Sequence, residues 1–142
     1  MLNQISVFVS NKSGRLKEVT GILAKNNIDI RALSIADTAD FGILRLIVNN
    51  PAEAEKVLKE NGLTVKITKV IGVSINDSIG SLHDVLGILF DEGISVEYLY
   101  AFITRKDSDA YVILRVEDNE RAIEALSKKG KTFLTADEVA SI

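Results

Sequence analysis

The sequence repeats itself at an offset of sixty-six residues, and this internal duplication limits what the chain can fold into. When residues 5–35 are aligned with residues 71–101, ten of the thirty-one pairs are identical. The same loop-and-helix segment occurs as NKSGRLKEVTGIL and again as DSIGSLHDVLGIL. A fixed period of this kind indicates two copies of one structural unit. We therefore predict two domains, at residues 1–69 and 70–142.

Hydrophobic periodicity predicts the order of helices and strands in each copy. Ile5, Val7 and Val9 recur at the period of a half-buried strand. Leu16 and Leu23 belong to an i, i+3, i+4, i+7 apolar stripe, which is typical of an amphipathic helix. In the first copy the predicted strands are 5–10, 28–35, 41–48 and 63–70, and the predicted helices are 16–23 and 52–60. The second copy repeats this βαββαβ order.

A βαββαβ order with right-handed crossovers produces a four-stranded antiparallel sheet with two helices on one face. No Pro- or Ser-rich spacer separates the copies, and Gly72 is the candidate hinge between them. We therefore predict an α+β fold of two ferredoxin-like plaits, packed side by side with joined antiparallel sheets and all helices on one face. The apolar residues expected on the open face are Phe8, Ile43, Ile47, Tyr111 and Ile113. Because a monomer rarely exposes such a patch, we expect a homodimer.

Composition argues against several classes of protein. Seventeen Lys and Arg against twenty Asp and Glu leave a net charge of −3, which gives no electrostatic reason to bind nucleic acid. Cysteine is absent from the sequence, so a disulfide framework and a thiolate metal site are excluded. No apolar run approaches the roughly 18 residues of a membrane span, and the N-terminus lacks signal-peptide features. We expect a cytoplasmic protein with neither a nucleic-acid nor a membrane partner.

Catalytic signatures are weak. His83 is the only histidine, and partners with a suitable spacing for catalysis or metal binding do not accompany it. The sequence also lacks a nucleophile elbow, a Walker loop and a Rossmann fingerprint. We expect no catalytic residue, no metal site and no cofactor.

Four glycines recur in equivalent positions and leave two interpretations open. Gly14 and Gly80 lie between the first strand and the first helix of each copy. There, glycine either permits a positive φ in a tight turn or lets an anion reach the free N–H groups of the helix. Gly21 and Gly87 fall inside the helices, where glycine costs about 1 kcal/mol relative to alanine. Either helices of the two copies approach closely there, or a side chain would clash with the sheet.

The repeated segment resembles the ACT domain, a small-molecule-sensing module of amino-acid metabolism. The resemblance rests on a strand, then Asp/Asn-x-x-Gly-x-Leu, an amphipathic helix, and Ile-Asp-Ile or Ile-Ser-Val. It covers nearly the whole chain twice, although Ser13 and Ile79 replace the proline that is common before the family's glycine. Family members bind an amino acid between two ACT units, using the loop after strand one of one unit and strand two of its neighbour.

This resemblance implies a set of ligand-binding residues in each copy. The implied residues are Asn11, Lys12, Ser13, Gly14, Arg15, Leu16, Ile28, Asp29, Ile30 and Arg31 in the first copy, and Asn76, Asp77, Ser78, Ile79, Gly80, Ser81, Leu82, Ile94, Ser95 and Val96 in the second. The second loop offers an acid and two hydroxyls, whereas Lys12 and Arg15 would repel an ammonium. We therefore expect the tighter site to combine 77–82 with 28–31, and a weaker or structural one to combine 11–16 with 94–96.

The resulting prediction is a free-standing tandem ACT protein that binds a small molecule, an amino acid, and has no activity of its own. The alternative within the same class is a regulatory subunit that binds a metabolic enzyme in trans. An RNA-recognition motif shares the βαββαβ order, but the basic-aromatic signature is missing and the charge is negative. An acylphosphatase-like enzyme would use Arg15, but Ser81 takes its place in the second copy.

Overall fold

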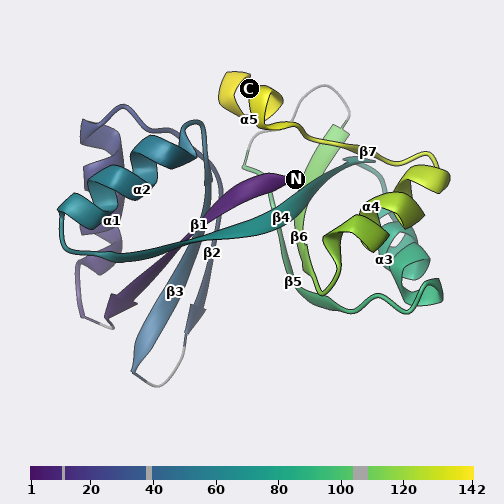
Figure 1. Ribbon diagram of the computed structural model, residues 1–142, viewed down its shortest axis with the longest axis horizontal. Helices are drawn as coiled ribbons and strands as arrows, with labels where there is room; N and C mark the ends of the chain where they lie inside the picture. Colours follow the sequence, from purple (N-terminus) through teal and green to yellow (C-terminus); the bar gives the residue numbers. More distant parts are fainter. Residues whose placement is uncertain (11, 38–39, 104–108) are drawn as a thin grey trace. The chain divides into compact units, whose positions relative to one another are not determined.

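The computed structural model describes residues 1–10, 12–37, 40–103 and 109–142 (Figure 1). The chain forms two compact units. We call Asn3–Thr68 with Val139–Ile142 the N-terminal unit, and Lys69–Glu138 with Met1–Leu2 the C-terminal unit. The predicted domains at residues 1–69 and 70–142 stay a prediction, because the two compact units do not show which segments of the chain fold independently.

The N-terminal unit has the predicted order of elements. It contains β1 (Leu2–Ser10), α1 (Arg15–Lys25), β2 (Ile30–Asp37), β3 (Phe41–Val48), α2 (Pro51–Glu60) and the first part of β4 (Thr64–Asn76). Its strands follow the order β2-β3-β1-β4, and β3 is antiparallel to both β1 and β2. Strands β1 and β2 therefore run in the same direction, and their C-terminal ends lie at the same edge of the sheet.

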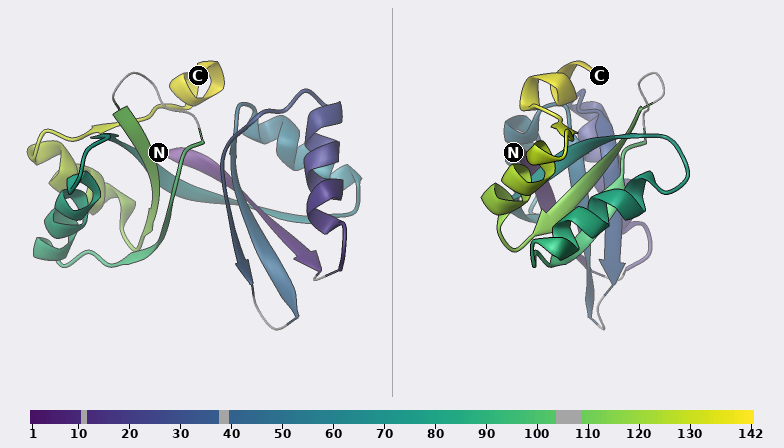
Figure 2. Two further views of the ribbon diagram at one scale, coloured as in Figure 1. Left: turned by 180° about the vertical axis from the view of Figure 1, so that it is seen from behind. Right: turned by 90° about the vertical axis from the view of Figure 1, so that its right-hand side faces the viewer.

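The core of the N-terminal unit lies between its sheet and its two helices, which cover one face (Figures 1 and 2). Ile5, Val7 and Val9 alternate along β1 toward this core, and Val19 and Leu23 meet them from α1. Helix α2 begins with Pro51. The first N–H groups of a helix have no partner within the helix, so a proline at this position removes no helical hydrogen bond. The period-2 pattern of β1 thus has the burial that it predicted, whereas in the helical stripe Val19 and Leu23 are buried and Leu16 is 45 % exposed.

The C-terminal unit repeats the order with a shortened final strand. It contains the rest of β4, α3 (Ser81–Asp91), β5 (Val96–Ala101), β6 (Asp109–Val116), α4 (Asn119–Lys128), β7 (Thr132–Phe133) and the start of α5 (Ala136–Ser141). Strand β6 pairs with β4 and β5, and the short β7 pairs with β4. The predicted α+β fold of two βαββαβ plaits is confirmed, whereas their side-by-side packing stays a prediction.

Helix α5 was not predicted, although its start has a sequence signal. The Thr135 hydroxyl accepts a hydrogen bond from the Glu138 N–H at 3.1 Å, and the Glu138 carboxylate accepts one from the Thr135 N–H at 3.2 Å. This reciprocal pair is a capping box, which the spacing Thr-x-x-Glu indicates.

Close packing explains Gly72, which the sequence suggested as a candidate hinge. It lies within the continuous strand β4, and a Cβ atom there would meet Leu2 Cδ1 at 2.9 Å and Leu134 Cβ at 3.2 Å. The Leu134 N–H also donates to the Gly72 carbonyl at 2.8 Å. Glycine within a strand is typical where another chain segment approaches closely.

Gly21 and Gly87, inside α1 and α3, are not explained by contact with the sheet. A Cβ atom on either glycine would meet no described atom within 4 Å, so the interpretation that a side chain would clash with the sheet is wrong. The close approach of helices from the two copies stays a prediction.

The apolar residues expected on an open sheet face do not form an exposed patch. Ile47, Tyr111 and Ile113 are 1 %, 7 % and 0 % exposed in the chain. Phe8 and Ile43 are half-buried, and the homodimer stays a prediction. None of the helices within the described ranges has the length and apolar character needed to cross a bilayer.

Candidate functional site

Helices α1 and α3 begin differently from α2 and α4. Asn50 and Asp118 cap α2 and α4 by accepting hydrogen bonds from first-turn N–H groups. At the starts of α1 and α3 stand Gly14 and Gly80, with φ angles of 85° and 89°, and no described side chain caps either helix. The positive φ explains why both residues are glycine. Glycine has no side chain to cap the helix, so the first-turn N–H donors of both helices can face a ligand.

A hollow of about 240 Å³ lies at the start of α1. It is smaller than the roughly 300–1,000 Å³ pockets that hold drug-sized ligands, so its size suits a small metabolite. Its lining residues are Val9, Ser10, Lys12, Gly14, Arg15, Leu16, Lys17, Ile35, Asp37 and Gly42. Four of them, Lys12, Gly14, Arg15 and Leu16, were predicted from the sequence. Asn11 lies outside the described residues.

Three lining residues that sequence reasoning missed come from the neighbouring strands. Ile35 and Asp37 lie at the end of β2, and Gly42 pairs with both Val9 and Asp37 at the start of β3. A Cβ atom on Gly42 would lie 3.4 Å from the Asp37 carboxylate, so the absent side chain leaves room for that carboxylate beside the hollow. The parallel strands β1 and β2 end at the same edge of the sheet, but strand order and register decide that Asp37 and Gly42 line the hollow.

The charges around this hollow are mixed in sign. Lys12, Arg15 and Lys17 supply cations, and Asp37 supplies a carboxylate. The Arg15 guanidinium is held in place, since its Nε donates to Ser10 Oγ at 2.9 Å and its Nη1 forms an ion pair with Glu18 at 2.8 Å. Backbone donors and cations on one side and a carboxylate on another match the two charges of a free amino acid.

The equivalent loop before α3 has a different chemistry. The Ser78 and Ser81 hydroxyls form a hydrogen bond with each other at 2.8 Å, and the Ser78 N–H donates to the Asn76 carbonyl. Ile79 is fully exposed, and Leu82 packs against the core of its own unit. The two hydroxyls expected to contact a ligand are therefore engaged with each other.

The strand-two residues expected to bind ligand are mostly engaged within their own units. Ile28 and Ile94 are both 6 % exposed and belong to the two cores. Asp29 exchanges hydrogen bonds with Asn49 through both its N–H and its carbonyl. Ile30 pairs with Val48 of β3, and Val96 pairs with Val116 of β6. Ser95 is exposed. Their combination with the loop of the other copy stays a prediction.

Arg31 holds the C-terminal segment of the chain. Its side chain is 11 % exposed, and it donates to the Val139 carbonyl at 3.0 Å and the Ala140 carbonyl at 3.2 Å while pairing with Asp29. A guanidinium at the C-terminal end of a helix is favourable, because the carbonyls there lack helical partners. The guanidinium of this predicted ligand-binding residue is thus already occupied.

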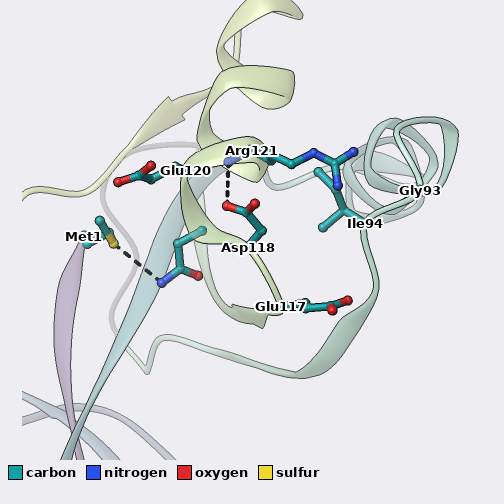
Figure 3. A pocket seen from close by; sticks show the side chains of 8 residues that line it. Met1, Gly93, Ile94, Glu117, Asp118, Glu120 and Arg121 are labelled. Atoms are coloured by element: carbon teal, nitrogen blue, oxygen red, sulfur yellow. Dashed lines mark hydrogen bonds between the residues drawn. The ribbon is translucent and has the colours of Figure 1, made fainter.

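A second hollow, of about 520 Å³, lies at the start of α4 (Figure 3). Asp118 caps the helix, and Asn119 Oδ1 is a buried acceptor for which the described residues provide no hydrogen-bond donor. Glu117 and Glu120 point away from each other, so their carboxylates do not converge on one point. In the described part of the chain, no three His, Asp or Glu side chains gather as a metal site would require.

A family model described as an ACT domain pair matches residues 1–142. The chain belongs to the ACT domain pair family. The resemblance inferred from the two Gly-x-Leu loops is therefore confirmed over the whole sequence. No curated protein matches this ACT domain pair closely enough to count as a relative.

Solved structures share the fold of this ACT domain pair. Protein BT0572 from Bacteroides thetaiotaomicron is 44 % identical, with a TM-score of 0.91 over 99 % of this chain and 96 % of that one. The regulatory subunit of aspartate kinase from Thermus thermophilus, in its ligand-free form, is 16 % identical, with a TM-score of 0.65 over 89 % and 90 % of the two chains. The corresponding subunit from Thermus flavus is 17 % identical, with a TM-score of 0.60 and the same coverage. At 16–17 % identity, the similarity to these two subunits shows a shared fold and no more.

Proposed function

We propose that this ACT domain pair is a cytoplasmic regulatory protein that binds a free amino acid and has no catalytic activity of its own. The observation that carries the proposal is the hollow at the start of α1. It combines an uncapped helix N-terminus, three cations and the Asp37 carboxylate within about 240 Å³.

The ligand carboxylate would accept hydrogen bonds from the first-turn N–H groups of α1. The helix dipole and the charges of Lys12 and Arg15 favour an anion at this position. The ligand ammonium would pair with Asp37, and Ile35 would contact an apolar part of the ligand. Both Asp37 and Ile35 lie at the end of β2, so the hollow is formed by one unit alone.

This proposal changes which loop we expect to bind more tightly. The sequence favoured the second loop because of its acid and its hydroxyls. In the structure Ser78 and Ser81 satisfy each other, whereas the first loop gains an acid from β2 that is distant from it in sequence. The site formed by the second loop with residues 28–31 stays a prediction and is the competing outcome of the experiment below.

We also propose that the protein acts in trans as a regulatory subunit of a metabolic enzyme. Support comes from the shared fold and size, since this chain covers 90 % of a separate regulatory subunit of aspartate kinase. Affinity capture from a lysate, with and without the bound amino acid, tests this part. A free-standing sensor would retain no enzyme under either condition.

A thermal-shift screen against the twenty amino acids identifies the ligand. A ligand present at about one hundred times its Kd adds roughly 2.7 kcal/mol to the stability of the folded state. For a chain of this length that corresponds to a rise in Tm of roughly 5–10 °C. The absence of a shift with all twenty would refute amino-acid binding.

Calorimetry on two matched variants then locates the site. Asp37→Asn removes the carboxylate at the first loop, and Asp77→Asn makes the same change at the second. We expect at least a tenfold loss of affinity in Asp37→Asn and unchanged affinity in Asp77→Asn. The opposite result would assign the ligand to the second loop, and unchanged affinity in both would remove both carboxylates from the mechanism.

A further inference from the structure

Helices α1 to α4 all end in the same hydrogen-bonded cap. After α2, the Leu63 N–H donates to the Leu58 carbonyl at 3.1 Å, and the Gly62 N–H donates to the Lys59 carbonyl at 3.0 Å. This pair of hydrogen bonds around a residue with positive φ is a Schellman motif. Equivalent pairs of hydrogen bonds close α1, α3 and α4. The residue before the positive φ differs between the helices: Asn26 in α1, Asn61 in α2, Glu92 in α3 and Lys129 in α4.

At two of these ends an asparagine side chain takes part in the cap. Asn61 Nδ2 donates to the Val57 carbonyl at 2.7 Å, and Asn26 Nδ2 donates to the Ile22 carbonyl at 2.8 Å. Carbonyl groups in the last turn of a helix lack a full set of helical partners, so each side-chain donor stabilises its helix end. The two ends differ in the next residue, because glycine follows Asn61 and a second asparagine follows Asn26.

The dipeptide Asn61–Gly62 is chemically labile. Asn-Gly occurs once in the sequence. The backbone nitrogen that follows an asparagine can attack the side-chain carbonyl carbon Cγ, and glycine leaves this nitrogen unhindered because it has no side chain. Asn61 and Gly62 are both exposed, so water reaches them. The covalent sequence therefore predisposes Asn61 to deamidation.

The closed cap of α2 restrains both groups that would react. The attacking nitrogen must lose its proton, but the Gly62 N–H donates that proton to the Lys59 carbonyl. The carbon under attack belongs to the carboxamide that the hydrogen bond to the Val57 carbonyl holds in place. Both hydrogen bonds must break before the ring can close, so the reaction requires the end of α2 to open.

We propose that Asn61 is a site of spontaneous deamidation that reacts only when the Schellman motif of α2 opens. In the open state the Gly62 nitrogen loses its proton to solvent and forms a bond to Asn61 Cγ, and the Cγ–Nδ2 bond breaks with release of ammonia. The product is a five-membered succinimide ring. Water then cleaves one of the two ring C–N bonds that join a carbonyl carbon to the nitrogen, which leaves aspartate or isoaspartate at position 61.

The deamidated chain cannot rebuild the same cap. Either product has a carboxylate in place of the Nδ2 donor, and both the Val57 carbonyl and the negative end of the α2 dipole repel it. Isoaspartate also adds one carbon atom to the backbone between Leu58 and Leu63, whose hydrogen bond closes the motif. The reaction is thus one-way and weakens a helix of the N-terminal unit. It does not depend on amino-acid binding, so the two proposals can fail separately.

Helices α1 and α4 provide internal controls. Asn26 has the same cap and the same side-chain hydrogen bond as Asn61, but the side chain of Asn27 hinders the nitrogen that would attack. In α4 the residue at the same place is Lys129, whose cation suits the negative end of a helix. The cap therefore does not require an asparagine, and the lability of α2 comes from the Asn-Gly pair.

Peptide mapping by mass spectrometry tests the proposal on the full chain. The protein is incubated at mildly alkaline pH, folded in one sample and unfolded in guanidinium chloride in the other. We expect Asn61 to deamidate at least about tenfold faster in the unfolded chain, because local opening no longer limits the reaction. In the unfolded chain Asn26 should deamidate much more slowly than Asn61. Equal rates at Asn61 in both samples, or equal rates at the two asparagines when unfolded, overturn the proposal.

Two matched variants separate opening of the cap from a general loss of stability. Leu63 and Leu99 are both half-buried and pack against the cores of the N-terminal and C-terminal units, respectively. Leu63→Ala keeps the Asn-Gly pair and should accelerate deamidation of Asn61 by at least about threefold in a chain that circular dichroism shows to be folded. Leu99→Ala should leave the rate unchanged. Equal acceleration by both variants would assign the reaction to unfolding of the whole chain and overturn the proposal.

The variant Asn61→Asp reproduces one product and tests whether the change is one-way. We expect a lower urea midpoint than that of the natural protein, because the carboxylate cannot donate to the Val57 carbonyl. Asn61→Lys, which introduces the residue found at this place in α4, is the control and should keep the natural midpoint. A midpoint of Asn61→Asp equal to that of the natural protein would show that the deamidated cap closes again and would overturn this part.

Discussion

Replacing Gly72 by alanine should destabilise the C-terminal unit, and the structure sets the size of the effect. The added Cβ would lie 2.9 Å from Leu2 Cδ1 and 3.2 Å from Leu134 Cβ, whereas carbon atoms pack best at about 3.5–4.0 Å. Leu2 can retreat by rotating its side chain. Leu134 cannot, because its N–H donates to the Gly72 carbonyl at 2.8 Å and fixes the backbone next to its Cβ.

Overpacking of this kind typically costs about 1–3 kcal/mol. In a strand, alanine is more favourable than glycine by roughly 0.5–1 kcal/mol, because it loses less backbone entropy on folding. The expected net loss therefore lies between about 0 and 2.5 kcal/mol, with a central value of about 1 kcal/mol, measured as a lower urea midpoint with an unchanged m-value. Gly21→Ala is the control, because its Cβ meets no described atom, and it should gain up to about 1 kcal/mol.

A companion variant separates the two neighbours of Gly72. In a Leu2→Ala background the 2.9 Å contact disappears, but the contact with Leu134 remains. We therefore expect the Gly72→Ala penalty to become smaller in that background without vanishing. If Gly72→Ala is as stable as the natural protein, close packing does not explain this glycine and a hinge must be reconsidered.

Three further predictions follow from single contacts. Arg31→Met should release the C-terminal segment, seen as faster amide hydrogen exchange at residues 139–142 with the rest of the chain unchanged. Asp118→Ala should lower stability by about 1 kcal/mol in urea denaturation, because α4 loses its cap. Lys131 donates a hydrogen bond to Asp84 and lowers the pKa of that carboxyl below its ordinary 3.8. The pair therefore stabilises the fold above about pH 4 and loses its effect as the pH falls further, so Asp84→Asn should be less stable than the natural protein at pH 6 and equal to it at pH 2.

The βαββαβ order could be predicted because it depends on local spacing. Ile5, Val7 and Val9 mark the buried face of β1, and Val19 and Leu23 mark the buried face of α1. Such patterns can be recognised from the sequence because each one spans only a few consecutive residues. Helix α5 also had a local signal, the capping box at residues 135–138, which the prediction missed.

Only the part of the candidate site that lies in the loops before α1 and α3 could be predicted from the sequence. The glycine loops follow from the repeat, and so do the positive φ angles that two such strand-to-helix turns require. Asp37 and Gly42 could not be found in the same way. They join the hollow because β2 and β3 bring their ends to the edge where β1 ends, which depends on strand order and register.

The sequence by itself determined the duplication, the family, the order of elements and the two loops that begin α1 and α3, since each is encoded in spacings of a few residues or in the repeat. Only the tertiary structure decided which carboxylate faces the first loop, why Gly72 has no side chain, and what Arg31 binds. These contacts join residues up to 109 positions apart, as between Arg31 and Ala140. Their geometry arises when strands take their register and helices cover the sheet, and no local pattern carries that information.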